Sequence, residues 1–197
     1  MVIGLDIDDT ITDTFGVMFG YAQKYTIEEL GKSGEIDYSK ICPNHNYIQA
    51  LHNWNGDEEL EFFRKYYKPI CEETEPFPFA VETINKLKEE GHTIVLITAR
   101  WDFDDTNVRR LTEDWIKKQN IHYDKLVVNA NTKLEAAQEN NVDVFVDDSF
   151  ENCKAVSDGG IKTFIMDTRC NKSLNDSKIE RVFSWPHLEH ELRKEIK

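Results

Sequence analysis

The chain has 197 residues and a net charge of −13, which comes from 24 basic and 37 acidic side chains. This length suits one α/β domain, alone or with an insertion, and excludes two full enzyme domains. The negative charge repels phosphate-coated polymers and anionic lipids, so we expect neither a nucleic-acid polymer nor a membrane as a partner. The apolar runs are also far shorter than the roughly 20 residues of a membrane-spanning helix.

The first residues and the cysteines predict a cytoplasmic protein. Acidic side chains occur at Asp6, Asp8 and Asp9, before any apolar leader could form, so we expect no signal or transit peptide. The four cysteines are widely spaced without a Cys-x-x-Cys pair, which favours reduced thiols over a disulfide framework. Cys42 and His45 form half of a zinc motif, and without a second pair we assign them to a loop.

Short apolar or β-branched runs alternate with helical patterns along most of the chain. This alternation predicts an α/β fold in which parallel strands are joined by helical crossovers. A polar loop over 169–177 and a closing helix over 187–196 are expected after the last strand. The predicted strands cover residues 2–7, 93–98, 125–128, 143–147 and 162–166.

Three of the predicted helices carry start or stop signals. Residues 80–90 place apolar side chains on one stripe and are followed by a glycine that ends the helix. Thr132 and Glu135 fit a capping box, which predicts a helix whose first turn contains Lys133, just beyond a strand end. Ser149 is expected to cap the helix that follows the fourth strand.

A long insertion separates the first strand from the helix at 80–90. About 65 residues occur there, whereas a crossover needs roughly a dozen. Apolar side chains at spacings of four and three predict helices that form a cap over the carboxyl edge of the sheet, as at Phe15, Phe19, Ala22 and Tyr25. The predicted domains are a Rossmann-like catalytic core over 1–14 and 78–197 and a helical cap over 15–77.

Polar side chains follow four of the predicted strands, and the carboxyl ends of parallel strands meet at one edge of a sheet, where ligands bind. Carboxylates packed closely at such an edge require a cation to offset their repulsion. A ligand set made of oxygen atoms favours Mg²⁺, with room for a substrate phosphate. The side chains are Asp6, Asp8 and Thr10 after the first strand, Thr98 and Arg100 after the second, Lys133 beyond the third, and Asp147 and Asp148 after the fourth.

Four motifs at these strand ends resemble, in the same order, the motifs of the haloacid dehalogenase superfamily of phosphohydrolases. They are Asp6-x-Asp8-x-Thr10, Thr98, Lys133 and the doublet Asp147-Asp148. The resemblance covers residues 1–166. It implies the doubly wound parallel sheet of that superfamily and a Mg²⁺-dependent phosphatase that forms an aspartyl-phosphate.

The resemblance also implies a role for each carboxylate. Asp6 would be the nucleophile, while Asp8 would be the general acid and later the base. Asp8 must therefore hold a proton that Asp6 lacks. Mg²⁺ would be bound by Asp6, by the backbone carbonyl of Asp8, and by Asp147 or Asp148.

A phosphate-binding group is implied beside these carboxylates. Thr98 and the backbone amides next to it, including that of Ala99, would donate hydrogen bonds to the phosphoryl oxygens. Lys133 would add positive charge against both the phosphate and Asp6. Arg100 is a further candidate for contact with the substrate.

Each of these residues also has an ordinary structural interpretation. Arg100 would either contact substrate or, as an exposed arginine, pair with Asp102 or Asp104. Asp9 alone would cap a turn, and an isolated Lys133 would be solvated. The arrival of all four motifs at one edge of one predicted sheet favours the catalytic interpretation.

Thirteen of the 22 aromatic residues lie within 15–79. Most of them must form the core of the cap, and we expect Phe15, Phe19 and Trp54 to line a substrate pocket that could stack a nucleobase. The place of the insertion, the small size and the segment 98–100 resemble the 5′(3′)-deoxyribonucleotidase family. That resemblance implies removal of phosphate from pyrimidine deoxynucleoside monophosphates.

Three functions are therefore considered. The first is a Mg²⁺-dependent nucleotidase that acts on (deoxy)nucleoside monophosphates. The second is the same chemistry on another small phosphate ester, such as a sugar or coenzyme phosphate. The third is a non-catalytic acidic domain that binds a cation or a protein, which the intact pair Asp6 and Asp8 disfavours. The sequence carries no signal for an oligomeric state.

Overall fold

The computed structural model describes residues 1–40 and 47–195. Its centre is a parallel sheet of six strands in the order β3-β2-β1-β4-β5-β6. The order reverses between β1 and β4, so the predicted doubly wound sheet is confirmed. The strands are β1 (Val2–Leu5), β2 (Thr93–Ile97), β3 (Lys125–Val127), β4 (Val144–Asp147), β5 (Lys162–Met166) and β6 (Ile179–Val182).

The five predicted strands are present, whereas the sixth strand, β6, was not expected from the sequence. It is a short edge strand in which two adjacent charged residues lie between two apolar ones, and only Val182 is fully buried. An edge strand needs little apolar sequence, because one side of it has no neighbouring strand to pack beside. The composition of β6 is therefore similar to that of the preceding polar loop, which is why the sequence did not predict a strand there.

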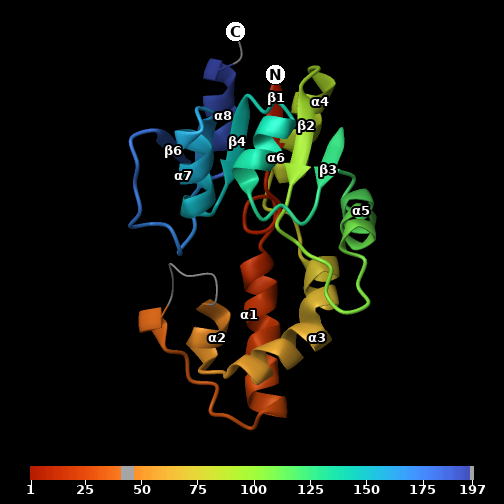
Figure 1. Ribbon diagram of the computed structural model, residues 1–197, viewed down its shortest axis with the longest axis vertical. Coiled ribbons are helices and arrows are strands. Elements are labelled where there is room, and N and C mark those ends of the chain that lie inside the picture. Colours follow the sequence, from red (N-terminus) through yellow and green to blue (C-terminus); the bar gives the residue numbers. More distant parts are fainter. Residues whose placement is uncertain (41–46, 196–197) are drawn as a thin grey trace.

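Helices cover both faces of the sheet (Figure 1). Within β2, Ile94 and Leu96 pack against one group of helices, while Val95 and Ile97 pack against the other. This alternation explains why the strands are apolar throughout, because each face is buried. The first group is α4 (Ala80–Glu89), α5 (Val108–Lys118) and α8 (Trp185–Glu195), and the second is α6 (Lys133–Glu139) and α7 (Phe150–Asp158).

The described residues between β1 and α4 include several helices, which lie beyond the carboxyl ends of the strands (Figure 1). Aromatic side chains, among them Tyr25, Phe62 and Tyr66, give these helices an apolar core of their own. The predicted helical character is confirmed, while the division into two domains stays a prediction. The elements are α1 (Thr14–Lys24), a π-helix (Tyr25–Glu29), a 3₁₀ turn (Tyr38–Lys40), α2 (Tyr47–His52) and α3 (Gly56–Glu73).

Two chain segments connect these helices to the sheet, and they run side by side. The Phe77 amide donates to the Ile11 carbonyl at 2.7 Å, and the Asp13 amide donates to the Glu75 carbonyl at 3.2 Å. The incoming and outgoing chains therefore support each other next to the end of β1. This pairing places the start of α1 close to the loop that carries Asp8.

The helix caps agree with the sequence at one position and differ at another. The Ser149 hydroxyl accepts a hydrogen bond from the Asn152 amide, as predicted. The predicted capping box at Thr132 is wrong, because the Thr132 side chain makes no capping hydrogen bond. The helix nevertheless begins at Lys133.

In the described part of the chain, no helix combines the length and hydrophobicity needed to cross a bilayer.

The cysteines differ partly from the expectation. Cys71 and Cys153 are free and buried, whereas Cys170 is disulfide-bonded, so the prediction of reduced thiols is wrong for that residue. Spacing along the chain does not report the distance between sulfur atoms in the fold, which decides whether a bond forms. The predicted loop pair Cys42 and His45 lies outside the described residues.

Candidate active site at the strand ends

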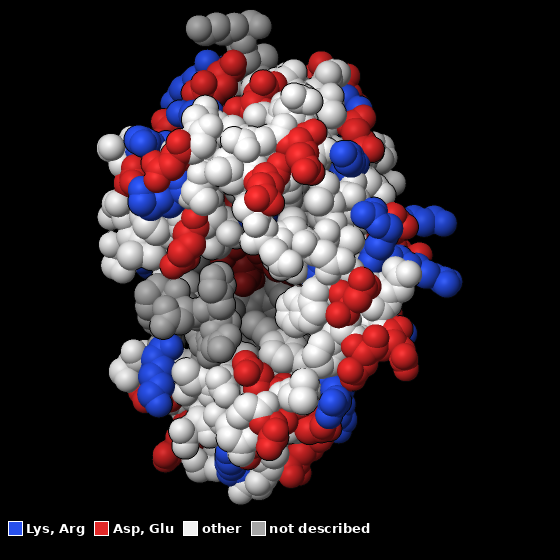
Figure 2. All heavy atoms as spheres, viewed as in Figure 1, with Lys and Arg blue, Asp and Glu red and all other residues white. Residues whose placement is uncertain are grey.

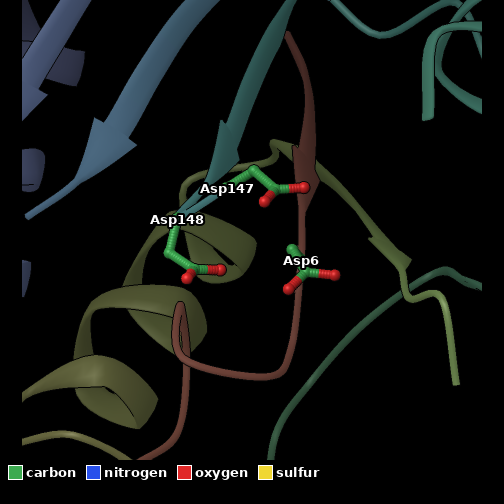
Figure 3. A group of neighbouring side chains, drawn as sticks. All are labelled: Asp6, Asp147 and Asp148. Carbon is green, nitrogen blue, oxygen red and sulfur yellow. The ribbon is translucent and has the colours of Figure 1, made fainter. Parts of the chain in front are cut away.

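Three carboxylates meet where the strand order reverses. Asp6 directly follows β1, Asp147 is the last residue of β4, and Asp148 comes next. One oxygen from each lies within 4.8 Å of the others, and Figure 3 shows the three carboxyl groups around one small space. The structure thus brings together the three side chains predicted to hold a metal. The three carboxylates meet because β1 and β4 pair in parallel, which aligns the carboxyl ends of the two strands.

Polar groups of α7 and of the loop after β5 orient the two neighbouring aspartates. Asp147 accepts hydrogen bonds from the Ser149 amide at 2.8 Å and from the Asn152 side chain at 3.1 Å. The Asn171 side chain is buried and donates to the Asp148 carbonyl at 2.7 Å. Such outer contacts fix the direction of metal-binding carboxylates. Sequence reasoning missed both asparagines, because they belong to no recognisable motif.

Lys133 lies within the carboxylate group. It is the first residue of α6 and is 3% exposed. Its ammonium donates to Asp6 and, at 2.5 Å, to the Ile97 carbonyl, and it lies 3.7 Å from Asp147. Although burial acts to lower it, the carboxylates of Asp6 and Asp147 raise the pKa of Lys133. The ammonium is therefore held charged against the two aspartates.

Replacing Lys133 by methionine should destabilise the protein. Methionine keeps the approximate length of the side chain but leaves Asp6 and Asp147 without a cation between them. Losing one partner of a buried ion pair costs about 3–5 kcal/mol. Urea unfolding should show this loss for Lys133→Met and almost none for Lys117→Met, which removes an exposed lysine from α5. Equal stabilities of the two variants would contradict the buried contact.

The charges of the site do not balance among its own side chains. Within residues 1–40 and 47–195, the four carboxylates of Asp6, Asp8, Asp147 and Asp148 lie near two cations, Lys133 and Arg100. Burial, helped by the Asp147 and Asp8 carboxylates and opposed by Lys133, raises the pKa of Asp6. Four carboxylates beside two cations in a small, oxygen-lined space fit a divalent cation such as Mg²⁺.

Arg100 does not occupy the exposed position that one of the two sequence interpretations gave it. Its side chain is 3% exposed rather than solvated, and it pairs with neither Asp102 nor Asp104. Instead, its guanidinium binds Asp8, with Nη2 donating to Oδ1 at 2.7 Å and Nε donating to Oδ2 at 2.9 Å. The parallel pairing of β1 with β2 explains the difference, because it brings the two strand ends together across 92 positions of sequence.

The two aspartates of the first motif have different electrostatic surroundings. Although burial acts to raise it, the Arg100 guanidinium and the Thr14 hydroxyl hold the pKa of Asp8 below its ordinary value. Burial raises the pKa of Asp6. The sequence gave no sign that Arg100 turns inward to Asp8.

The turn after β1 and the threonine after β2 complete the group. Asp9 adopts a left-handed conformation, with φ of 57°, and its carboxylate accepts from the Phe15 amide in the first turn of α1 at 2.7 Å. Thr98 is fully buried, and its oxygen accepts from the Arg100 amide at 3.1 Å, which leaves the hydroxyl proton available. Ala99 is exposed beside it.

Two of the three predicted pocket aromatics remain at the surface of the helices. Phe15 and Phe19 are partly buried, with ring centres 5.7 Å apart. Trp54 is 6% exposed, lies in the apolar core and donates through Nε1 to the Thr26 hydroxyl at 3.0 Å. The expected pocket role of Trp54 does not agree with this placement. Its isolated position in the sequence could not distinguish a core ring from a pocket ring.

Trp54→Ala should therefore change stability rather than ligand binding. Removing a buried indole costs about 3–5 kcal/mol, because it leaves a cavity. Urea unfolding should show this loss, while Phe183→Ala, at a ring that is 66% exposed, should cost far less. A variant that keeps wild-type stability would contradict the core position.

The carboxylate group lies near the junction between the sheet and the helices. Figure 2 shows a hollow between these two parts of the molecule, with acidic atoms visible in its depth. An acidic floor repels anions unless a cation is bound there. The site as a whole therefore suits a hard cation together with an anionic ligand.

Comparison with known proteins agrees with this arrangement. Residues 1–194 match the family described as 5′ nucleotidase, deoxy (Pyrimidine), cytosolic type C protein. The chain is 29% identical to YqfW of Bacillus subtilis over 185 residues, which cover 93% of this chain and 89% of that protein. It is 27% identical to Nucleotidase CA_C3379 of Clostridium acetobutylicum over 184 residues, or 93% and 88% of the two chains.

A solved structure shares the fold. The haloacid dehalogenase-like family hydrolase SP0104 from Streptococcus pneumoniae superimposes with a TM-score of 0.65 and 16% identity, covering 100% of this chain and 98% of that one. At this identity the likeness shows the fold alone. The predicted haloacid dehalogenase type of sheet is thereby confirmed.

Proposed function

Because the chain belongs to the family of 5′ nucleotidases described as deoxy (pyrimidine), cytosolic type C, we propose that it is a Mg²⁺-dependent nucleotidase acting through an aspartyl-phosphate. It is a phosphoric monoester hydrolase of the haloacid dehalogenase type. The observation that carries the proposal is the meeting of Asp6, Asp147, Asp148 and Lys133 at adjacent strand ends.

Asp6, Asp147 and Asp148 would hold the ion, together with the backbone carbonyl of Asp8. The close approach of three carboxylate oxygens and the excess of negative charge support this ligand set. When bound, Mg²⁺ offsets the negative charge of the phosphoryl oxygens and of the aspartates. Asn152 and Asn171 hold the Asp147 carboxylate and the Asp148 backbone in place.

The first chemical step is attack by a carboxylate oxygen of Asp6 on the phosphorus of the ester. A bond forms between Asp6 and phosphorus, the bond from phosphorus to the alcohol oxygen breaks, and the electron pair goes to that oxygen. Asp8 gives a proton to the leaving alcohol. Arg100 then faces the anionic form of Asp8, which it stabilises.

The second step removes the phosphate from Asp6. A water molecule attacks the phosphorus while Asp8, now a carboxylate, accepts one of its protons. The bond between phosphorus and the Asp6 oxygen breaks, which releases inorganic phosphate and restores both aspartates. The Thr98 hydroxyl, the amide of Ala99 and the Lys133 ammonium would bind the phosphoryl oxygens during both steps.

The proposed substrates are (deoxy)nucleoside monophosphates. The family match supports this class, and the partly buried rings of Phe15 and Phe19, which follow the catalytic loop directly, would pack against the nucleoside. Trp54 is not included, because it packs inside the helices.

Phosphate release from a panel of monophosphates tests the proposal. The panel contains pyrimidine and purine nucleotides with ribose or deoxyribose, sugar phosphates and a coenzyme phosphate, each with Mg²⁺ or with EDTA. The highest kcat/KM should occur with a nucleotide and depend on Mg²⁺, because kcat/KM reports differential binding of the transition state. A higher value for a sugar or coenzyme phosphate would contradict the substrate class, and undiminished activity in EDTA would contradict the metal.

A further inference from the structure

Asp8 and Arg100 form a two-point ion pair at the ends of neighbouring strands. Nε of Arg100 donates to Oδ2 at 2.9 Å and to Oδ1 at 3.2 Å, while Nη2 donates to Oδ1 at 2.7 Å. The Asp8 side chain is 30% exposed, whereas that of Arg100 is 3% exposed. The guanidinium therefore lies behind the carboxylate, which separates it from the solvent side of the site.

Arg100 is itself fixed from several directions. Its amide donates to the Thr98 hydroxyl oxygen at 3.1 Å, and its carbonyl accepts from the Asn129 amide at 2.9 Å. The guanidinium carbon lies 5.6 Å from the centre of the Trp115 ring. A planar guanidinium held in this way presents its two donors in one orientation, which a lysine ammonium cannot do.

The hydrogen bonds distinguish the two oxygens of Asp8. Oδ1 accepts from Nη2 of Arg100 and from the Thr14 hydroxyl, both at 2.7 Å. Among the described residues, Oδ2 accepts only from Nε of Arg100. Because a carboxylate oxygen can accept about two hydrogen bonds, Oδ2 keeps one acceptor position free. One oxygen of Asp8 is thus fully anchored, and the other is available for a proton.

The pair is not explained by stability alone. Nη1 of Arg100 is buried and has no hydrogen-bond partner within 1–40 and 47–195. A buried donor of a charged group without a partner costs free energy. Destabilising features such as an unpartnered buried donor are expected at positions where a side chain serves function.

We infer that Arg100 is a positioning residue for hydrolysis, because its two donors hold the Asp8 carboxylate with Oδ2 free to exchange a proton with the ester oxygen. Arg100 acts only through Asp8 and binds neither the phosphate nor the alcohol. The inference deepens the proposed function and rests on it. In the first step Oδ2 releases its proton to the leaving alcohol, and in the second step it accepts a proton from the attacking water.

Arg100→Lys tests this role, because it keeps the charge and removes the two-point contact. The variant is compared on a deoxynucleoside 5′-monophosphate, whose alcohol is a poor leaving group, and on p-nitrophenyl phosphate, whose phenolate leaves without a proton. We expect kcat for the nucleotide to fall by about 10–100-fold and kcat for the aryl ester by less than about threefold. KM for both esters should stay within about threefold of the wild type.

Arg109→Lys is the matched control, because Arg109 lies on the exposed side of α5. It should leave both rates unchanged. Equal losses on both esters, a large rise in KM, or no loss at all for Arg100→Lys would overturn the inference. A rise in KM would instead assign Arg100 to phosphate binding. In Arg100→Ala, millimolar guanidinium chloride should restore part of the nucleotide activity, and no restoration would count against the role.

A second site keeps the test decisive if the Arg100 variants do not fold. Thr14→Val removes the other anchor of Oδ1 and should lower the nucleotide rate selectively by about 3–10-fold, while Thr14→Ser, which keeps the hydroxyl, should restore it. A uniform loss on both esters would overturn the inference. If the wild type cleaves sugar phosphates but no nucleotide, the proposed substrate fails, and glycerol 2-phosphate replaces the nucleotide in the comparison. If the wild type cleaves no ester, both the proposed function and the inference about Arg100 are overturned.

Discussion

Asp6→Asn should abolish turnover while the fold is retained. Asparagine has nearly the shape of aspartate, but its amide is not a nucleophile, so the aspartyl-phosphate cannot form. The loss in kcat should be about 10⁴-fold or more, as for other essential nucleophiles. Phosphate release from the best nucleotide of the panel measures it, with circular dichroism to confirm the fold.

The matched control for this variant is Asp114→Asn. Asp114 is a strongly exposed aspartate on α5, so its replacement tests the loss of one negative charge at the surface. Its rate should equal that of the wild type. If Asp6→Asn keeps near wild-type activity, the nucleophile is another group, and a covalent mechanism at Asp6 is excluded.

Asp8→Asn should slow hydrolysis by about 10²–10⁴-fold, with the largest loss for esters of poor leaving groups. The reason is that asparagine cannot give a proton to an alkoxide, whereas a nitrophenolate leaves without one. A series of aryl and alkyl phosphates with different leaving-group pKa values measures the dependence. The slope of log kcat against leaving-group pKa should become steeper in the variant.

A parallel decrease for all esters would contradict the role of Asp8 as the acid. The double variant Asp8→Asn/Arg100→Lys separates this role from that of Arg100. If Arg100 acts through Asp8, the double variant should be about as slow as Asp8→Asn alone. If the rate losses of the two single variants multiply in the double variant, Arg100 acts independently of Asp8.

The sequence predicted the parts of the site that lie directly at strand ends. Asp6, Thr98 and Asp147 follow apolar runs, and parallel pairing brings the ends of such runs together. Lys133 was placed through its position at a helix start, and the position held although the expected cap at Thr132 did not form. These residues were predictable because strand and helix boundaries alone determine where they lie.

The direction in which a side chain turns was not predictable from local sequence. Arg100 has acidic neighbours at Asp102 and Asp104, and nothing in that segment indicates that its partner is Asp8. The pair forms because β1 and β2 are adjacent in the sheet, which is a tertiary property. The assignment of Trp54 failed for the same reason, since only the packing of α1, α2 and α3 decides which rings are inside.

Residues that orient the site but lie outside the motifs could not be predicted from the sequence either. Asn152 and Asn171 orient the aspartates of the doublet, yet one lies in an ordinary helix and the other in a polar loop. Asparagine is common in both settings, so its presence there indicates no function. Such residues become recognisable only when the partner of each hydrogen bond is known.

Chemical trapping at Asp6 tests the central claim most directly. The protein is mixed with Mg²⁺ and a nucleoside monophosphate, quenched with acid during turnover and treated with borohydride, which reduces an acyl phosphate to an alcohol. Peptide mass spectrometry should then find homoserine at position 6, and only in samples that contained both Mg²⁺ and substrate. Turnover at the normal rate without any modification at position 6 would contradict the aspartyl-phosphate mechanism.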